Sequence, residues 1–175
     1  MMFGMVGAGK SHVARWLAPY RHAVHLRADG LRMAMFGEDR PELYTPENKA
    51  LVNNALQYAS KKILQSGTAD VIHDANHNQR RVRHQIEILA RAHGAVPVVV
   101  WVKVPEETAK QRIQSRAATE GHVIFDPHII ENMRKTTDDP GTDEIVITID
   151  GLRTPAEQQK SFEEQLTNLQ EQKGV

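Results

Sequence analysis

Short apolar runs alternate with longer amphipathic stretches along this chain. The apolar runs lie at 1–3, 23–26, 69–73, 96–104 and 144–149, and their composition is typical of buried strands. Between them, apolar residues recur every three or four positions, which predicts helices. Strands that alternate with helices form a parallel sheet covered by helices on both faces. We therefore expect a three-layer α/β/α protein with five parallel strands in one sheet.

Capping residues and helix breakers set the ends of the predicted helices. The first helix follows Ser11 and ends before Pro19, and the longest opens with Thr45 and ends at Gly67. Its core-facing stripe is expected to comprise Leu51, Val52, Ala55, Leu56, Ala59 and Ile63. Further helices are predicted at 79–93, 105–116, 129–134 and from 154 onward.

The segment from Gly4 to Ser11, with the sequence GMVGAGKS, fits the pattern G-x-x-x-x-G-K-[ST] of a phosphate-binding loop. Glycines let successive backbone N–H groups turn inward around a phosphate, where a Cβ would obstruct them. Lys10 would reach the β- and γ-phosphates, and the Ser11 hydroxyl would ligate Mg²⁺. Only three residues precede the loop, whereas typical strands have about five or six. We expect this short strand to reduce stability rather than abolish function.

The composition narrows the class of protein. The 175 residues suit a single domain over 1–175, and 22 basic against 22 acidic residues give no field that recruits nucleic acid or an anionic membrane. The chain has no cysteine, which excludes disulfides, thiolate catalysis and cysteine-based zinc sites. No apolar run approaches the roughly 18 residues of a membrane span, and no leader is evident. We expect a soluble, cytoplasmic protein without membrane contacts; the oligomeric state stays undetermined.

Polar residues follow two predicted strands, where the carboxyl ends of a parallel sheet meet the phosphate loop. Asp29 is placed to take the proton of an acceptor hydroxyl, and Arg32, one helical turn later, to hold a phosphate. The alternative is that Asp29 only caps a helix starting at Gly30 and that Arg32 is solvated. Asp74 occupies the place of a carboxylate that holds Mg²⁺ directly or through water.

Two histidines flank that carboxylate. His73 and His77 are four residues apart, a spacing that suggests metal ligands when both lie on one helix face. Because His73 ends a strand and His77 lies in a loop, we interpret them instead as polar loop residues near the substrate.

Two groups of basic residues have competing interpretations. Arg112 and Arg116 project from one side of a helix that enters the segment 117–140, where an arginine could offset transition-state charge; a solvated face is the alternative, and Arg116 is favoured. The segment 117–140 is interpreted as a lid that excludes water. A second cluster could guide nucleic acid, but it lacks interleaved aromatic residues, so we interpret it as the solvated side of a helix: Arg80, Arg81, Arg83 and His84.

In this order, the motifs resemble P-loop kinases of the polynucleotide 5′-hydroxyl kinase group, to which zeta-toxin-like and other small-molecule kinases are related. The resemblance rests on the phosphate loop, on D-x-x-R at Asp29 and Arg32, on D-x-N-x-N at Asp74, and on Arg116. It implies ATP and Mg²⁺ as cofactors, Asp29 as general base, Arg32 as a ligand of acceptor phosphate, and Asp74 as support for that arginine or the metal shell. Catalytic roles are thereby implied for Lys10, Asp29, Arg32, Asp74 and Arg116, metal contacts for Ser11 and Asp74, and nucleotide contacts for Gly4, Gly7, Ala8, Gly9, Lys10, Ser11, His12, Arg112 and Arg116.

These observations predict a kinase that moves the γ-phosphate of MgATP to a hydroxyl acceptor. A polynucleotide 5′-hydroxyl is slightly favoured, with a small-molecule acceptor close behind. A third alternative is an NTP-binding switch that phosphorylates nothing, which the Asp29 and Arg32 pair disfavours. Contacts to the base are expected near 140–142 or at the start of the last helix after Asp150.

Overall fold

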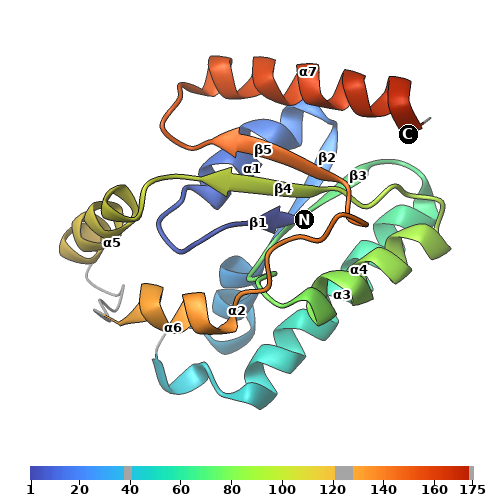
Figure 1. Cartoon of the computed structure of the whole chain (residues 1–175). Helices are drawn as coiled ribbons and strands as arrows, with labels where there is room; N and C mark the ends of the chain where they lie inside the picture. The colour runs from blue at the N-terminus through green and yellow to red at the C-terminus, as the bar shows by residue number, and fades with distance from the viewer. Residues whose placement is uncertain (38–40, 121–127, 174–175) are drawn as a thin grey trace.

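The computed structural model describes residues 1–37, 41–120 and 128–173. Helices cover both faces of a parallel sheet (Figure 1), so the predicted α/β fold is confirmed. The elements are, in chain order, β1 (Met2–Phe3), α1 (Lys10–Tyr20), β2 (Ala23–Arg27), α2 (Ala28–Phe36), the 3₁₀ turn η1 (Pro41–Leu43), α3 (Pro46–Ser66), β3 (Asp70–Asp74), α4 (Arg80–Ala92), β4 (Val99–Lys103), α5 (Glu106–Glu120), α6 (Ile129–Thr136), β5 (Val146–Asp150) and α7 (Pro155–Lys173).

The strands form two parallel sheets rather than the single five-stranded sheet that we predicted. One sheet has the order β1-β4-β5, and the other pairs β2 with β3. Helices α1 and α7 pack together on one side, while α3 packs on β2 and β3 and contacts α4. The phosphate loop connects β1 to α1, so it lies at the carboxyl end of β1.

The division of the sheet follows from the shortness of β1. This strand has two residues, and its backbone pairs with β4, where Met2 lies opposite Val100. On the other side, β1 contacts β3, but the carbonyl oxygen of Met2 accepts a hydrogen bond from the His77 side chain over 2.9 Å. The His77 side chain, from the loop after β3, thus binds a carbonyl oxygen that would accept a backbone N–H if β1 and β3 were paired strands.

The main hydrophobic core lies between the sheet and the α1–α7 layer. Trp16 of α1 and Phe162 of α7 meet edge to face, with ring centroids 6.2 Å apart. The Trp16 indole N–H donates to Gln158 Oε1, so the half-buried ring has a polar partner. The buried apolar members of this core are Met2, Ala8, Val13, Ala14, Leu17, Ile72, Val100, Val102, Ile147, Ile149 and Phe162.

Several boundaries differ from the predicted ones. Helix α1 continues through Pro19 to Tyr20, because a proline in the last turn removes only one helical hydrogen bond. Helix α2 begins at Ala28, so Asp29 lies within the first turn instead of capping it. Strand β4 is limited to 99–103, and Leu51 of the predicted apolar stripe is 48% exposed. In the parts of the chain that the structure describes, no helix is long and apolar enough to cross a membrane.

Candidate active site

The phosphate loop is a tight turn that requires glycine at defined positions. Gly4, Gly7 and Gly9 have φ values of 134°, 79° and 98°, which L-residues with a Cβ rarely adopt. A Cβ on Gly4 would lie 2.4 Å from the backbone oxygen of Val102, and a Cβ on Gly7 would lie 2.5 Å from that of Ala109. The loop therefore packs directly against the backbones of β4 and α5, and its glycines provide both the turn and the close approach.

Lys10 is the first residue of α1 and lies at the centre of the site. Its Nζ donates to the carbonyl oxygens of Gly4 and Met5 over 2.8 and 3.0 Å. Burial lowers the pKa of the Lys10 amine to about 8; the negative charges of Asp74 and Asp29 counteract this shift, and the positive charge of Arg116 adds to it. The three predicted site residues from β3, α2 and α5 therefore lie close enough to act on one amine.

Asp29 and Arg32 are bound to each other on the first turns of α2. Arg32 Nη1 donates to Asp29 Oδ1 over 2.9 Å and to the Tyr44 hydroxyl over 3.2 Å. The guanidinium also stacks on the Tyr44 ring, 4.2 Å from its centroid. Arg32 is 6% exposed, so the solvated alternative is wrong, while the Asp29 side chain is 63% exposed. The pair presents a carboxylate to solvent and encloses the arginine.

Asp74 is the last residue of β3 and is buried. Its Oδ2 accepts a hydrogen bond from His25 Nε2 over 3.0 Å. Asp74 thus lies at the carboxyl end of a strand, on the face that carries Lys10. Sequence reasoning missed His25, because alternation within 23–27 gives only its face on its own strand, whereas the register with β3 places it beside Asp74.

His73 and His77, which we predicted to be polar loop residues near the substrate, are buried and bind each other. His77 Nδ1–H donates to the Met2 carbonyl oxygen, which leaves its Nε2 to accept from His73 Nδ1–H over 2.9 Å. Burial lowers the pKa of His73 to about 4 and that of His77 well below its ordinary value, so both rings are neutral. This assignment leaves His73 Nε2 as a buried nitrogen for which the described residues provide no partner.

Arg112 of α5 links the phosphate loop to the turn after β5. Its two terminal nitrogens donate to the carbonyl oxygens of Ala8 and Gly151 over 3.2 and 2.9 Å. A hollow of about 340 Å³ opens beside this bridge; its lining residues are Ala8, Gly9, His12, Val13, Arg112, Gly151, Leu152, Arg153 and Gln158. The base site expected after Asp150 coincides with this hollow. The alternative site at 140–142 is absent from its lining.

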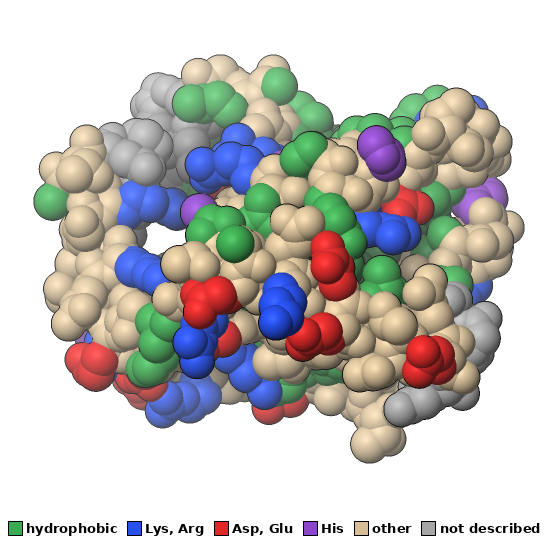
Figure 2. All heavy atoms as spheres, turned by 90° about the horizontal axis from the view of Figure 1, so that it is seen from above, with side chains coloured by type: hydrophobic (Ala, Val, Ile, Leu, Met, Phe, Trp, Pro, Cys, Tyr) green, Lys and Arg blue, Asp and Glu red, His purple; other side chains and the backbone are tan. Residues whose placement is uncertain are grey.

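Arg116 lies one turn beyond Arg112 on α5 and is exposed. Figure 2 shows Lys and Arg side chains around an opening at the end of the molecule that carries α5. The predicted lid at 117–140 includes the end of α5 and all of α6, but 121–127 lie outside the described residues. Ile130 of α6 packs against Ala109 and Ile113 of α5. The lid stays a prediction.

The basic cluster on α4 faces solvent at Arg81 and His84, as predicted, but the prediction is wrong for Arg83. Arg83 is fully buried and donates to both carboxylate oxygens of Glu144, over 2.8 and 3.1 Å. It also donates to the carbonyl oxygens of His77 and Asn78 over 2.9 and 3.2 Å. Burial acts to raise the pKa of Glu144, but bonds from Arg83 and the Gly141 N–H outweigh it and lower that pKa. Arg83 therefore ties the loop after β3 to the segment before β5.

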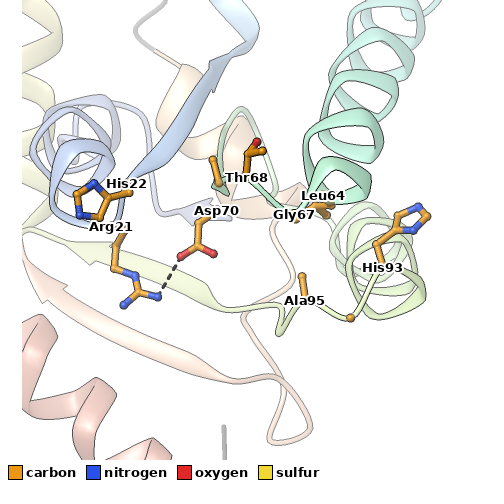
Figure 3. Close-up of a pocket in the computed structure, with 10 residues that line it drawn as sticks. Arg21, His22, Leu64, Gly67, Thr68, Asp70, His93 and Ala95 are labelled. Atoms are coloured by element: carbon orange, nitrogen blue, oxygen red, sulfur yellow. Dashed lines mark hydrogen bonds and ion pairs between the residues drawn. The ribbon is translucent and has the colours of Figure 1, made fainter.

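A second hollow, of about 330 Å³, lies at the amino ends of β2 and β3, opposite to their carboxyl ends (Figure 3). Arg21 and Asp70 form an ion pair of 3.0 Å within it, and His22, Thr68 and His93 are among the other lining residues. Because the two opposite charges neutralise each other and the phosphate loop is at the other end of the strands, we place the active site at the first hollow.

Ser11 and Asp74 are suitable ligands for Mg²⁺ that arrives with a nucleotide. Ser11 lies in the first turn of α1, and Asp74 supplies a carboxylate of the kind that hard cations prefer. Within the described ranges, no three His, Asp or Glu side chains form a group that could hold a metal alone. The donor set thus fits a metal that keeps waters and takes phosphate oxygens as further ligands.

Comparisons with known proteins agree with this geometry. Among curated proteins, none matches the chain in sequence. Similar solved structures include a Chloroflexus aurantiacus protein described as a candidate kinase (TM-score 0.75, 18% identity, 95% of this chain and 94% of that chain) and a gluconokinase from Sinorhizobium meliloti 1021 (0.69, 18%, 97% and 91%). The APS kinase of Mycobacterium tuberculosis, in complex with AMPPNP and APS, is also similar (0.67, 19%, 95% and 95%).

At these identities, the likeness to solved structures establishes a P-loop NTPase-like α/β fold. A family model described as the AAA domain matches residues 1–140, which include the phosphate loop, Asp29, Arg32, Asp74, Arg112 and Arg116. The chain therefore belongs to the AAA domain family.

Proposed function

We propose that this protein is an ATP-dependent kinase that transfers the γ-phosphate of MgATP to the hydroxyl of a small molecule. The observation that carries the proposal is the set of side chains around Lys10. Its Nζ bonds the loop carbonyl oxygens of Gly4 and Met5, and the charges of Asp74, Asp29 and Arg116 act on its amine. A phosphate-binding amine, a candidate metal ligand, a candidate base and a candidate phosphate-binding arginine are the parts that phosphoryl transfer requires.

In this proposal, the loop N–H groups and Lys10 hold the β- and γ-phosphates, and the base occupies the hollow beside Arg112. Ser11 and Asp74 would hold Mg²⁺, which would supply positive charge that offsets the negative charge of the phosphates. Arg116 binds the phosphate oxygens as charge develops on them. The solved APS kinase, which is similar in fold, is a complex with AMPPNP and APS, so this fold accommodates a nucleotide and an acceptor together.

Asp29 is the proposed general base. Arg32 binds its Oδ1 and leaves the other oxygen to face the acceptor. The acceptor oxygen forms a bond to the γ-phosphorus while the bond from that phosphorus to the β–γ bridging oxygen breaks; the hydroxyl proton passes to Asp29, and ADP leaves. Arg32 and Tyr44 keep the carboxylate in position for this transfer.

The enclosure of Arg32 favours a small-molecule acceptor. The resemblance assigns this arginine to acceptor phosphate, yet its guanidinium is bound by Asp29, covered by Tyr44 and 6% exposed. A guanidinium with these partners must break existing contacts before it can bind a nucleic-acid phosphate. The polynucleotide 5′-hydroxyl, which the sequence slightly favours, is therefore our second candidate.

The test follows labelled γ-phosphate from MgATP into a panel of sugars, nucleosides and other hydroxyl compounds, with a 5′-hydroxyl oligonucleotide as a separate arm. We expect label in a small molecule, and its loss in Asp29→Asn without loss of ATP binding. Asp70→Asn, at the far end of the sheet, is the matched control and should retain transfer. Label in the oligonucleotide alone would select the second candidate; ATP hydrolysis without any labelled acceptor would identify an NTP-binding switch.

A further inference from the structure

His25 of β2 and Asp74 of β3 are diagonal neighbours on one face of the sheet. In the parallel register, His25 lies opposite Ile72, and Asp74 follows Ile72 by two residues. His25 Nε2 is 3.0 Å from Asp74 Oδ2. Because an ionised carboxylate can only accept, the imidazole carries the proton and donates it. The two side chains are 15% and 6% exposed, so water competes weakly for this bond.

The bond occupies only one of the two carboxylate oxygens. In the part of the chain that the structure describes, no hydrogen-bond donor is found for Asp74 Oδ1. The charge of Asp74 acts on Lys10, so the carboxylate lies on the phosphate-loop side of β3. A carboxylate that is held at one oxygen has less rotational freedom, and its second oxygen then has a defined direction.

We propose that His25 is a positioning residue that directs Asp74 Oδ1 toward the Mg²⁺ of bound MgATP. The inference rests on the proposed function, in which Asp74 is a metal ligand. Carboxylates that ligate metals are themselves commonly held by hydrogen bonds, and loss of such a bond typically costs about 10- to 100-fold in metal affinity or activity. His25 touches neither metal nor acceptor in this role, because its Nε2–H is used by Asp74.

A merely structural role for the same bond has a different signature. Strand β2 is paired only with β3 in the described sheet, so the bond could serve to fix these two strands. In that case, its loss would lower the free energy of unfolding but would leave the effect of Mg²⁺ on nucleotide binding unchanged. The affinity gain that Mg²⁺ gives therefore separates the two roles, whereas activity alone does not.

The experiment measures the dissociation constant of a fluorescent ATP analogue with and without Mg²⁺. His25→Phe keeps a ring in the strand but removes the donor, whereas His25→Gln places an amide N–H near the position of Nε2. We expect His25→Phe to reduce the Mg²⁺-dependent gain in affinity by about 10- to 100-fold and to leave metal-free binding unchanged. His25→Gln should restore most of the gain, and His25→Val replaces His25→Phe if the latter does not fold.

Asp74→Asn is measured in parallel so that two failures can be told apart. If Asp74→Asn loses the gain from Mg²⁺ while a folded His25→Phe keeps it, the positioning role is wrong and the proposed metal site stands. If both variants keep the gain, Asp74 does not hold the metal, and this part of the proposed function fails together with the role of His25. In the Asp74→Asn background, His25→Phe should have no further effect on Mg²⁺ dependence.

Discussion

Acidification should destabilise this protein through its buried histidine pair, in a pH range where most carboxylates stay ionised. His73 and His77 are 4% and 1% exposed, and they form a chain from His73 Nδ1 through His77 to the Met2 carbonyl oxygen. In the unfolded chain, both rings titrate near pH 6.5. In the folded protein, a proton on His73 Nε2 would place a charge in an apolar site without a described acceptor.

The size of the effect follows from the shifted pKa of His73. Burial, with a smaller effect from the positive amino terminus, lowers this pKa from 6.5 to about 4. The unfolded state therefore binds more protons than the folded state between these values, so stability is complete above pH 6.5 and falls as the pH decreases. Because of this difference in proton binding, His73 alone lowers the free energy of unfolding by about 2 kcal/mol at pH 5. The decrease is about 3 kcal/mol once the pH is below both the folded and the unfolded pKa of His73. The lowered pKa of His77 acts in the same direction.

Urea unfolding between about pH 7.5 and about pH 5 measures this slope. The informative variant is His73→Asn, because an amide nitrogen near the position of Nδ1 can still donate to His77 while the titrating Nε2 is removed. Over this pH range, we expect the free energy of unfolding of His73→Asn to decrease by about 2 kcal/mol less than that of the parent protein. All other titrating groups are common to both proteins, so equal pH slopes would refute the assigned burial and tautomer of His73.

Two further predictions concern packing around the site. Gly7→Ala places a Cβ 2.5 Å from the Ala109 carbonyl oxygen at a φ of 79°. We expect it to lower the free energy of unfolding in urea by more than about 1 kcal/mol and to weaken ATP binding. Wild-type values of both quantities would contradict the close approach. Arg83→Met removes the bidentate partner of buried Glu144, which then keeps only Arg80 at 3.4 Å and the Gly141 N–H, and it should lower the free energy of unfolding by about 3 kcal/mol. Arg81→Met, at an exposed neighbour, should change it by less than about 0.5 kcal/mol. Similar effects of both arginine substitutions would contradict the buried ion pair.

The order of most strands and helices was predictable because these elements have local signals, whereas helix α2 was not among the predicted helices. Thr45, for example, caps α3 through a hydrogen bond from the Asn48 N–H to its side chain, as its place before a proline suggests. The single five-stranded sheet was wrong because pattern reasoning assumes that adjacent strands pair through their backbones. The sequence pattern does not indicate that the His77 side chain donates to the Met2 carbonyl oxygen of a two-residue strand.

The roles of the predicted site residues stay predictions, and sequence reasoning did not identify the partners that these residues have in the structure. A carboxylate after a strand can be placed at the sheet edge from sequence order, which is why Asp29 and Asp74 were found. Arg83 was misassigned because a basic residue on an amphipathic helix normally faces water, and its partner Glu144 is 61 residues away. A buried ion pair between such distant residues depends on tertiary packing, and the local sequence around either residue does not predict it.

The phosphate loop uses its basic residues in two ways, and the hydrogen bonds explain how. When backbone N–H groups turn inward around an anion, the carbonyl groups of the same turn must point outward and find donors. Lys10 provides donors for Gly4 and Met5, and Arg112 provides one for Ala8. In the proposed function, a bound γ-phosphate competes with the loop carbonyl oxygens for Lys10 only. Arg112 keeps its second bond, to Gly151 beside the hollow. Arg112 therefore holds the loop and the hollow in fixed relation, and in the proposed function Lys10 would exchange loop carbonyl oxygens for phosphate oxygens.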